Sequence, residues 1–229
     1  MTGPAADLAT LQDATDRLLA SLDDLDDAGV AQPSRLPGWS RGHVLAHLAR
    51  NADALVNVLR GRLMYPSEAA RDADIERDAH RPADVHRADL RDSADRLAAT
   101  AAALTDEQWR ATVTLRNGVT DRATTIPFRR WVEIELHHID LDIGRTVADL
   151  PGAFLDRALE YLTERFAGHP GVVPLELRAE DGRHWRTGRP EGEPQVITGT
   201  PAALVGWLSG RTSGSGLATG DSLPGLPAL

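Results

Sequence analysis

Two pairs of an acid and a histidine overlap in the stretch of residues 127–145, PFRRWVEIELHHIDLDIGR. They are Glu133 with His137 and Glu135 with His138. Glu133 and His137 stand four residues apart, so on a helix their side chains lie over the same turn and can bind one ion. Burying a carboxylate and an imidazole without a partner or a metal would be costly. The spacing therefore predicts either a divalent-metal site, completed by ligands from a facing helix, or a buried Glu–His hydrogen bond that orders the core.

A helical wheel distinguishes the two pairs. At about 100° per residue, this stretch has two apolar arcs with a polar seam between them. The seam consists of Glu133, His137, Asp140 and Gly144. The opposite set carries mixed charge and is predicted to be the solvent-exposed face: Glu135, His138, Asp142 and Arg145. We therefore expect chemistry from the seam and none from the opposite face.

A second helix, predicted over residues 41–62, could supply a further ligand. Ser40 precedes it and is a suitable N-cap. His47 and Asn51 lie at the margin of its apolar arc, whereas His43 lies further towards water. An imidazole at such a margin can meet the polar seam of another helix. Considered by itself, His47 is more typical of a hydrogen-bonded core histidine than of a metal ligand.

The elements that position these residues form a bundle. Apolar residues at helical spacing predict four amphipathic helices, over residues 6–25, 41–62, 85–104 and 127–145. The charged segment 61–84 lacks an apolar stripe and is predicted to be a long crossover loop, in which Tyr65 could approach a ligand. Asn117-Gly118 between β-branched residues predicts a hairpin. Four helices with one long connection predict a four-helix bundle, whose interior can hold a metal.

The composition changes near residues 149–152, which indicates a second domain. The predicted elements are a helix over 153–166, two short strands around Glu180-Asp181-Gly182, a strand over 195–198, a short helix from Pro201, and a Gly/Ser-rich tail without regular structure. The expected fold class is therefore mainly α, with a four-helix bundle at residues 1–150 and a small α/β domain at residues 151–229.

Composition narrows the function. The chain has 229 residues and a formal net charge of −9, which argues against nucleic acid and anionic membranes and favours small-molecule partners. It has no cysteine, so a metal must be held by His, Asp or Glu, and any thiol must come from outside. We find no basic leader, no run of about 20 apolar residues and no GxGxxG, P-loop, HExxH or GxSxG motif. A cytoplasmic location is expected.

Three stretches resemble a known family. LPGWSRGHVLAHLARNADAL, RLMYPSEAARDADIE and RRWVEIELHHIDLDIG are similar to the mycothiol-dependent maleylpyruvate isomerases, whose first domain is a DinB-like four-helix bundle. The similarity covers most of residues 1–150 and continues more weakly to WLSGRTSG. It implies that His47, Glu133 and His137 bind zinc, or another divalent ion, with a fourth position open as in catalytic sites.

The resemblance also implies further roles. Asp140, one turn beyond His137, is a candidate acceptor that orients an imidazole, although an ordinary helix-face aspartate is an equal alternative. Arg211, in LSGRTSG, matches a family arginine that would act in catalysis by binding a substrate carboxylate or the enolate. Arg129 and Arg130 are alternatives for this role.

The implied reaction is the cis–trans isomerisation of maleylpyruvate to fumarylpyruvate in gentisate breakdown. A cis C=C bond rotates only after a nucleophile has added and made it single. The mycothiol thiolate would be that nucleophile, and zinc would lower the pKa of the thiol. The expected partners are a small dicarboxylate and mycothiol, with the chain as a monomer or small homo-oligomer.

Three other functions fit the same residues. A zinc-dependent S-transferase would use the same thiolate to attack another electrophile. A metal-dependent hydrolase would need a general base, for which only Asp140 is placed. A noncatalytic metal-binding module is disfavoured, because a purely structural bundle could replace these polar residues with leucine at no cost in stability.

Overall fold

The computed structural model describes residues 4–228 and is mainly helical, as the sequence predicted. The chain divides into two compact units, Met1–Ile143 and Gly144–Leu229. Among the described helices, none combines the length and the hydropathy that crossing a bilayer requires.

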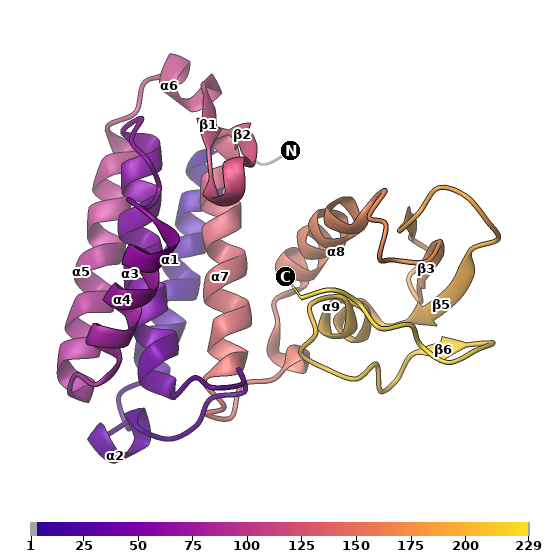
Figure 1. Cartoon of the computed structure of the whole chain (residues 1–229), viewed down its shortest axis with the longest axis horizontal. Coiled ribbons are helices and arrows are strands. Elements are labelled where there is room, and N and C mark those ends of the chain that lie inside the picture. The colour runs from indigo at the N-terminus through magenta and orange to yellow at the C-terminus, as the bar shows by residue number, and fades with distance from the viewer. Residues whose placement is uncertain (1–3, 229) are drawn as a thin grey trace. The chain divides into compact units, whose positions relative to one another are not determined.

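The first unit is a four-helix bundle. Its long helices are α1 (Pro4–Ser21), α3 (Arg41–Leu59), α5 (Ala83–Ala102) and α7 (Ile126–Asp140). They run side by side in Figure 1, with the short helices α2 (Asp27–Val30) and α6 (Asp106–Arg110) at opposite ends. Leucine, valine, isoleucine and alanine side chains fill the space between them, as the 3.6-residue periodicity predicted. The four-helix prediction is confirmed.

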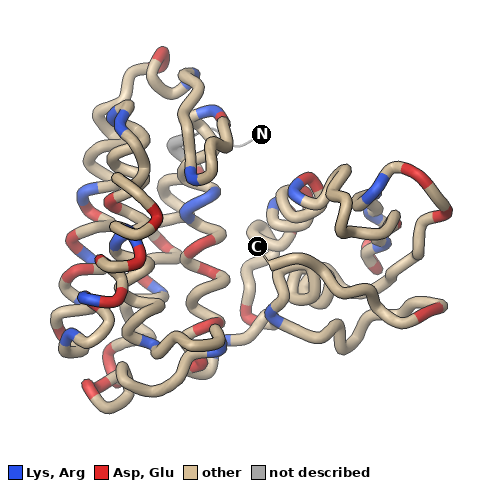
Figure 2. Tube along the Cα trace, viewed as in Figure 1, with Lys and Arg blue, Asp and Glu red and all other residues tan. Residues whose placement is uncertain are grey.

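The segment 61–84 differs from the prediction, because it contains the helix α4 (Glu68–Ala79). The Ser67 side chain accepts a hydrogen bond from the Ala70 amide and caps it. The helix packs on α3 but buries only Ile75, Asp78 and Ala79. One large apolar residue in twelve produces no amphipathic stripe, so the prediction of a crossover loop was wrong. Both acidic and basic residues occur along this helix, and the acidic ones predominate (Figure 2).

A short hairpin leads into α7. Strands β1 (Thr112–Thr114) and β2 (Thr120–Arg122) pair antiparallel, with the 3-10 turns η1 (Arg116–Gly118) and η2 (Ala123–Thr125) after them. Asn117 and Gly118 have φ angles of 58° and 73°, which confirms the predicted Asn-Gly turn. Pro127 lies in the first turn of α7, where its missing amide hydrogen is not needed.

The prediction for the end of α7 was wrong. The helix ends at Asp140, and Asp142 has a φ of 54°, so Gly144 and Arg145 are not part of the helical seam. Asp142 is exposed, as predicted, but Glu135 and His138 are buried.

The reason is that α1 covers this face of α7. Glu135 Oε1 accepts hydrogen bonds from Trp131 Nε1 and from Arg17 Nη2 of α1, both at 3.0 Å. These partners offset the cost of burying the carboxylate. Glu135 therefore belongs to the interface between α1 and α7.

The second unit is a small α/β fold. It contains the 3-10 turn η3 (Val147–Asp149), the helices α8 (Gly152–Phe166) and α9 (Pro201–Leu208), and the strands β3 (Leu175–Ala179), β4 (His184–Thr187), β5 (Gln195–Gly199) and β6 (Ala218–Thr219). The strand order is β4-β3-β5-β6, with β3 and β5 parallel and the other pairs antiparallel. The predicted elements are present, and β6 is an addition within the Gly/Ser-rich tail.

Candidate metal centre

Three side chains from two helices converge in the first unit. His47 of α3 and His137 of α7 place their Nε2 atoms 3.1 and 3.2 Å from Glu133 Oε2. The three ligand atoms all lie within 4.8 Å of one another. The structure thus brings together the residues that the sequence singled out.

The ends of α3 and α7 are fastened together beside these residues. The Ser40 side chain accepts from the His43 amide and fixes the start of α3. Arg41 then donates from Nε to the Leu141 carbonyl at 2.7 Å and from Nη2 to the Asp142 carbonyl at 2.9 Å. A cation on these carbonyls suits the negative end of the α7 dipole. These contacts hold His47 opposite the Glu133 and His137 turn.

Burial and mutual contact set the charge of the three residues. Burial lowers the pKa of His47 to about 4, against the opposing hydrogen bond to Glu133, so this imidazole is neutral at pH 7. Burial opposes the ionisation of Glu133, but its hydrogen bonds to both histidines outweigh this and hold its pKa well below 4.5. Burial also disfavours charge on His137, yet hydrogen bonds to Asp140 and Glu133 raise its pKa above 6.5. One neutral imidazole and one carboxylate are therefore ready to bind a cation.

This donor set fits a divalent cation. Two imidazole nitrogens and one carboxylate oxygen are ligands that zinc and similar ions accept. The Glu133 side chain is 34% exposed, so an ion and a further ligand can reach the three atoms from solvent. Three protein ligands with access on one side are the arrangement of a catalytic site.

Asp140 orients His137. Its Oδ2 lies 2.8 Å from His137 Nδ1, and its side chain is 2% exposed. We expect Asp140→Asn to weaken metal binding about 10- to 100-fold, because the carboxylate fixes the ring and its tautomer. Equilibrium dialysis against zinc would measure this. An unchanged zinc affinity would mean that Asp140 is an ordinary helix residue.

Three neighbours of the triad were not predicted as part of it. The Trp39 ring lies 5.6 Å from the His47 ring, and Arg71 of α4 places its Nη2 3.3 Å from His47 Nδ1. Tyr65 lies beside Arg71, and burial raises the pKa of its hydroxyl, although Arg71 opposes this. Tyr65 was predicted only as a residue of the connecting segment that could approach a ligand. Arg71 was not predicted, because no apolar stripe indicated α4.

The two alternative arginines of α7 have different surroundings. Arg129 forms an ion pair with Asp121 of the hairpin at 2.6 Å. Arg130 is buried, and its Nη1 donates to Asn51 Oδ1 at 2.9 Å. Burial lowers the pKa of Arg130 to about 10, although the nearby Glu133 carboxylate opposes this. Arg130 thus keeps its charge at neutral pH.

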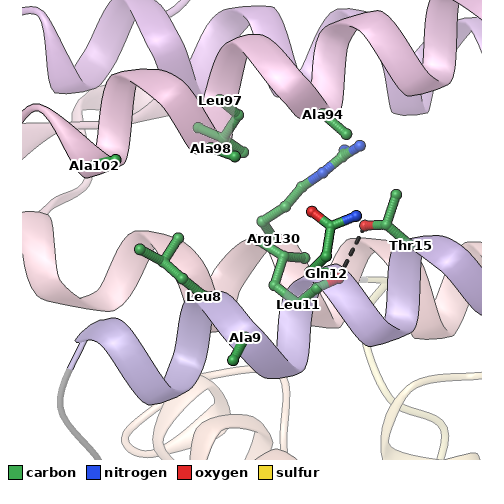
Figure 3. Close-up of a pocket in the computed structure, with 10 residues that line it drawn as sticks. All are labelled: Leu8, Ala9, Leu11, Gln12, Thr15, Ala94, Leu97, Ala98, Ala102 and Arg130. Carbon is green, nitrogen blue, oxygen red and sulfur yellow. Dashed lines mark hydrogen bonds between the residues drawn. The ribbon is translucent and has the colours of Figure 1, made fainter.

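Arg130 also borders a cavity of about 290 Å³, which α1 and α5 line mainly with leucine and alanine. Figure 3 shows its side chain reaching across from α7 towards Ala94.

Arg211 belongs to the second unit, just after α9. Its amide donates to the Gly206 carbonyl at 2.8 Å, and its Nη1 donates to the Ser209 carbonyl at 2.6 Å. These local contacts order the LSGRTSG loop, and the catalytic role of Arg211 stays a prediction.

Comparisons with known proteins agree across the chain. A family model described as the mycothiol maleylpyruvate isomerase N-terminal domain matches residues 11–142, and a model of the C-terminal domain of the same family matches residues 149–228. The crystal structure of a mycothiol-dependent maleylpyruvate isomerase is similar, with a TM-score of 0.89 and 25% identity over 100% of both chains. A histidine-to-alanine mutant of such an isomerase gives the same values. No curated protein matched the sequence.

Proposed function

The chain belongs to the mycothiol-dependent maleylpyruvate isomerase family, and we propose that it converts maleylpyruvate into fumarylpyruvate at a metal centre formed by His47, Glu133 and His137. Family membership makes it an enzyme and implies mycothiol as its thiol. The convergence of the three ligand atoms within 4.8 Å is the observation that carries the assignment of the centre.

The reaction needs a thiolate at neutral pH. A divalent cation in this centre would stabilise the thiolate of mycothiol and so lower the pKa of the thiol. The chain itself has no cysteine, so the nucleophile must be external. Zinc is the ion we favour, because it accepts two imidazoles and one carboxylate and leaves an open position.

The chemical sequence has three steps. The thiolate adds to one carbon of the cis double bond, and the electron pair moves into the adjacent carbonyl to form an enolate. The former double bond is now single and rotates. The electron pair then returns, expels the thiolate and leaves the trans double bond, so the thiol is not consumed.

In these reaction steps, the residues of the chain orient the metal ligands and stabilise the negative charges of the substrate. Asp140 holds the His137 ring through Nδ1. The enolate and the two substrate carboxylates require cations, and we assign Arg211 to one of these anions on the basis of the family resemblance. Arg130, buried near Glu133 with its charge retained, is the alternative from the first unit.

A spectrophotometric assay of zinc-loaded protein on maleylpyruvate, with and without mycothiol, tests the proposal. We expect fumarylpyruvate only when mycothiol is present, and a large loss of activity in Arg211→Ala with the zinc content unchanged. No turnover by protein that carries one zinc per chain would contradict the isomerase. A stable mycothiol adduct of a supplied electrophile would then identify an S-transferase.

A further inference from the structure

Arg71 of α4 faces the metal centre from a side that the proposed reaction has not used. Its Nη2 lies 3.3 Å from His47 Nδ1, and its side chain is only 11% exposed. The guanidinium carbon lies 5.9 Å from the centre of the Tyr65 ring. The face of an aromatic ring attracts a cation at this distance. Its carboxylate partner is the neighbouring Asp72, at 2.7 Å from Nη1, and the Asp72 side chain is 66% exposed. Because Asp72 is exposed, this ion pair holds the Arg71 guanidinium only weakly.

The two histidines of the centre have opposite partners on their outer nitrogens. His137 Nδ1 meets a carboxylate, that of Asp140, whereas His47 Nδ1 meets the guanidinium of Arg71. A histidine that binds a cation through Nε2 carries its hydrogen on Nδ1 and donates it to an acceptor. Arginine has donors only. The Arg71 contact with His47 therefore suits the metal-free centre, and Arg71 loses this acceptor when a cation is bound.

The charges around the centre indicate what Arg71 can bind instead. The carboxylates of Glu133, Asp140 and Asp72 outnumber by one the guanidinium groups of Arg71 and Arg130, which both lie close to Tyr65. A divalent cation then leaves positive charge in excess. A carboxylate balances that charge, and the planar fork of an arginine matches it with two parallel hydrogen bonds.

We propose that Arg71 binds a carboxylate of the substrate beside the metal, and that in the metal-free protein it is held on His47. The choice of a dicarboxylate as the anion rests on the proposed function. The inference that Arg71 binds an anion rests on its contacts in the structure and does not depend on that function. Arg71 thereby couples the binding of the metal to the binding of the substrate. A cation bound to His47 releases the Arg71 guanidinium, which can then bind a substrate carboxylate.

Calorimetric titration with fumarate, an unreactive dicarboxylate, tests this proposal without turnover or mycothiol. The variants are Arg71→Met, which keeps the length but removes the charge, and Arg71→Lys, which keeps the charge but not the fork. Arg77→Met is the matched control, because Arg77 lies on the same helix with a side chain 60% exposed. Zinc affinity is measured in parallel by competition with a chelator, and circular dichroism checks that each variant is folded.

We expect zinc-loaded protein to bind fumarate about tenfold or more tightly than zinc-free protein. Arg71→Met should bind fumarate about tenfold more weakly, and Arg71→Lys should lose less affinity than that. Arg77→Met should bind fumarate as tightly as the unchanged protein. Arg71→Met should also bind zinc about threefold more tightly, because a positive charge beside a ligand has been removed.

Fumarate binding that is unchanged in Arg71→Met would overturn the proposal. So would a loss of zinc affinity in this variant, because Arg71 would then only position His47. If the isomerase assay fails while these binding results hold, the proposed function is wrong and the role of Arg71 as an anion-binding residue stands.

Discussion

Replacing His137 with alanine is expected to remove the bound metal and to lower isomerase activity by more than about 100-fold, since the loss of a residue that merely orients a ligand already costs up to that much. His137 is one of the three proposed metal ligands, and its Nε2 lies 3.2 Å from Glu133 Oε2. Its side chain is only 14% exposed, so truncation to alanine also leaves a cavity and lowers the stability to some extent. Metal analysis, activity and circular dichroism should show a folded protein without metal. His47→Ala should behave in the same way.

The adjacent histidine provides the matched control. His138 is buried and lies outside the polar seam of α7. His138→Ala should lose stability but retain its metal. Activity that survives in His137→Ala, or metal that is lost equally from both variants, would contradict the assignment of the triad.

Replacing Asp78 with alanine is expected to lower the free energy of unfolding by about 1–3 kcal/mol. Asp78 lies on α4 with its side chain 1% exposed. Its carboxylate oxygens lie 2.6 Å from Arg81, 2.9 Å from Arg77 and 3.7 Å from Arg50 of α3. Alanine would leave Arg50, which is 21% exposed, and Arg81 to share Asp89, which lies 2.6 and 3.1 Å from them. Urea unfolding followed by circular dichroism measures the change.

Asp74 of the same helix is the control for charge removal. Its side chain is 44% exposed and pairs with Arg77, which is 60% exposed. Asp74→Ala should change the unfolding free energy by no more than about 1 kcal/mol, because exposed ion pairs contribute little. Equal effects of the two substitutions would show that burial of Asp78 does not matter.

The triad could be predicted in part because it is local. Glu133 and His137 share one helical turn, so their approach follows from helix geometry alone. The wheel also placed His47 at the margin of a buried face. Which histidine on a second helix meets the pair depends on how two helices pack, and for this the family resemblance was needed.

The errors have physical causes that a single helix does not reveal. Glu135 and His138 carry polar groups and were predicted to be exposed, yet Arg17 of α1 and Trp131 supply Glu135 with partners that permit burial. Helix α4 was missed because Ile75 is the one large apolar residue that it buries. Its pairs with α3 include Asp78 with Arg50 and Glu76 with His43, and no apolar periodicity reports such contacts. With α4 unrecognised, Arg71 had no predicted position near His47.

X-ray absorption spectroscopy at the zinc edge tests most directly whether this centre activates an external thiol. The chain contains no cysteine, so a thiolate sulfur bound to zinc can come only from mycothiol. We predict nitrogen and oxygen neighbours alone in the zinc-loaded protein, and one added sulfur at about 2.3 Å after mycothiol is supplied. His47→Ala and His137→Ala should give no such signal. A zinc-loaded protein whose spectrum does not change with saturating mycothiol would contradict the account.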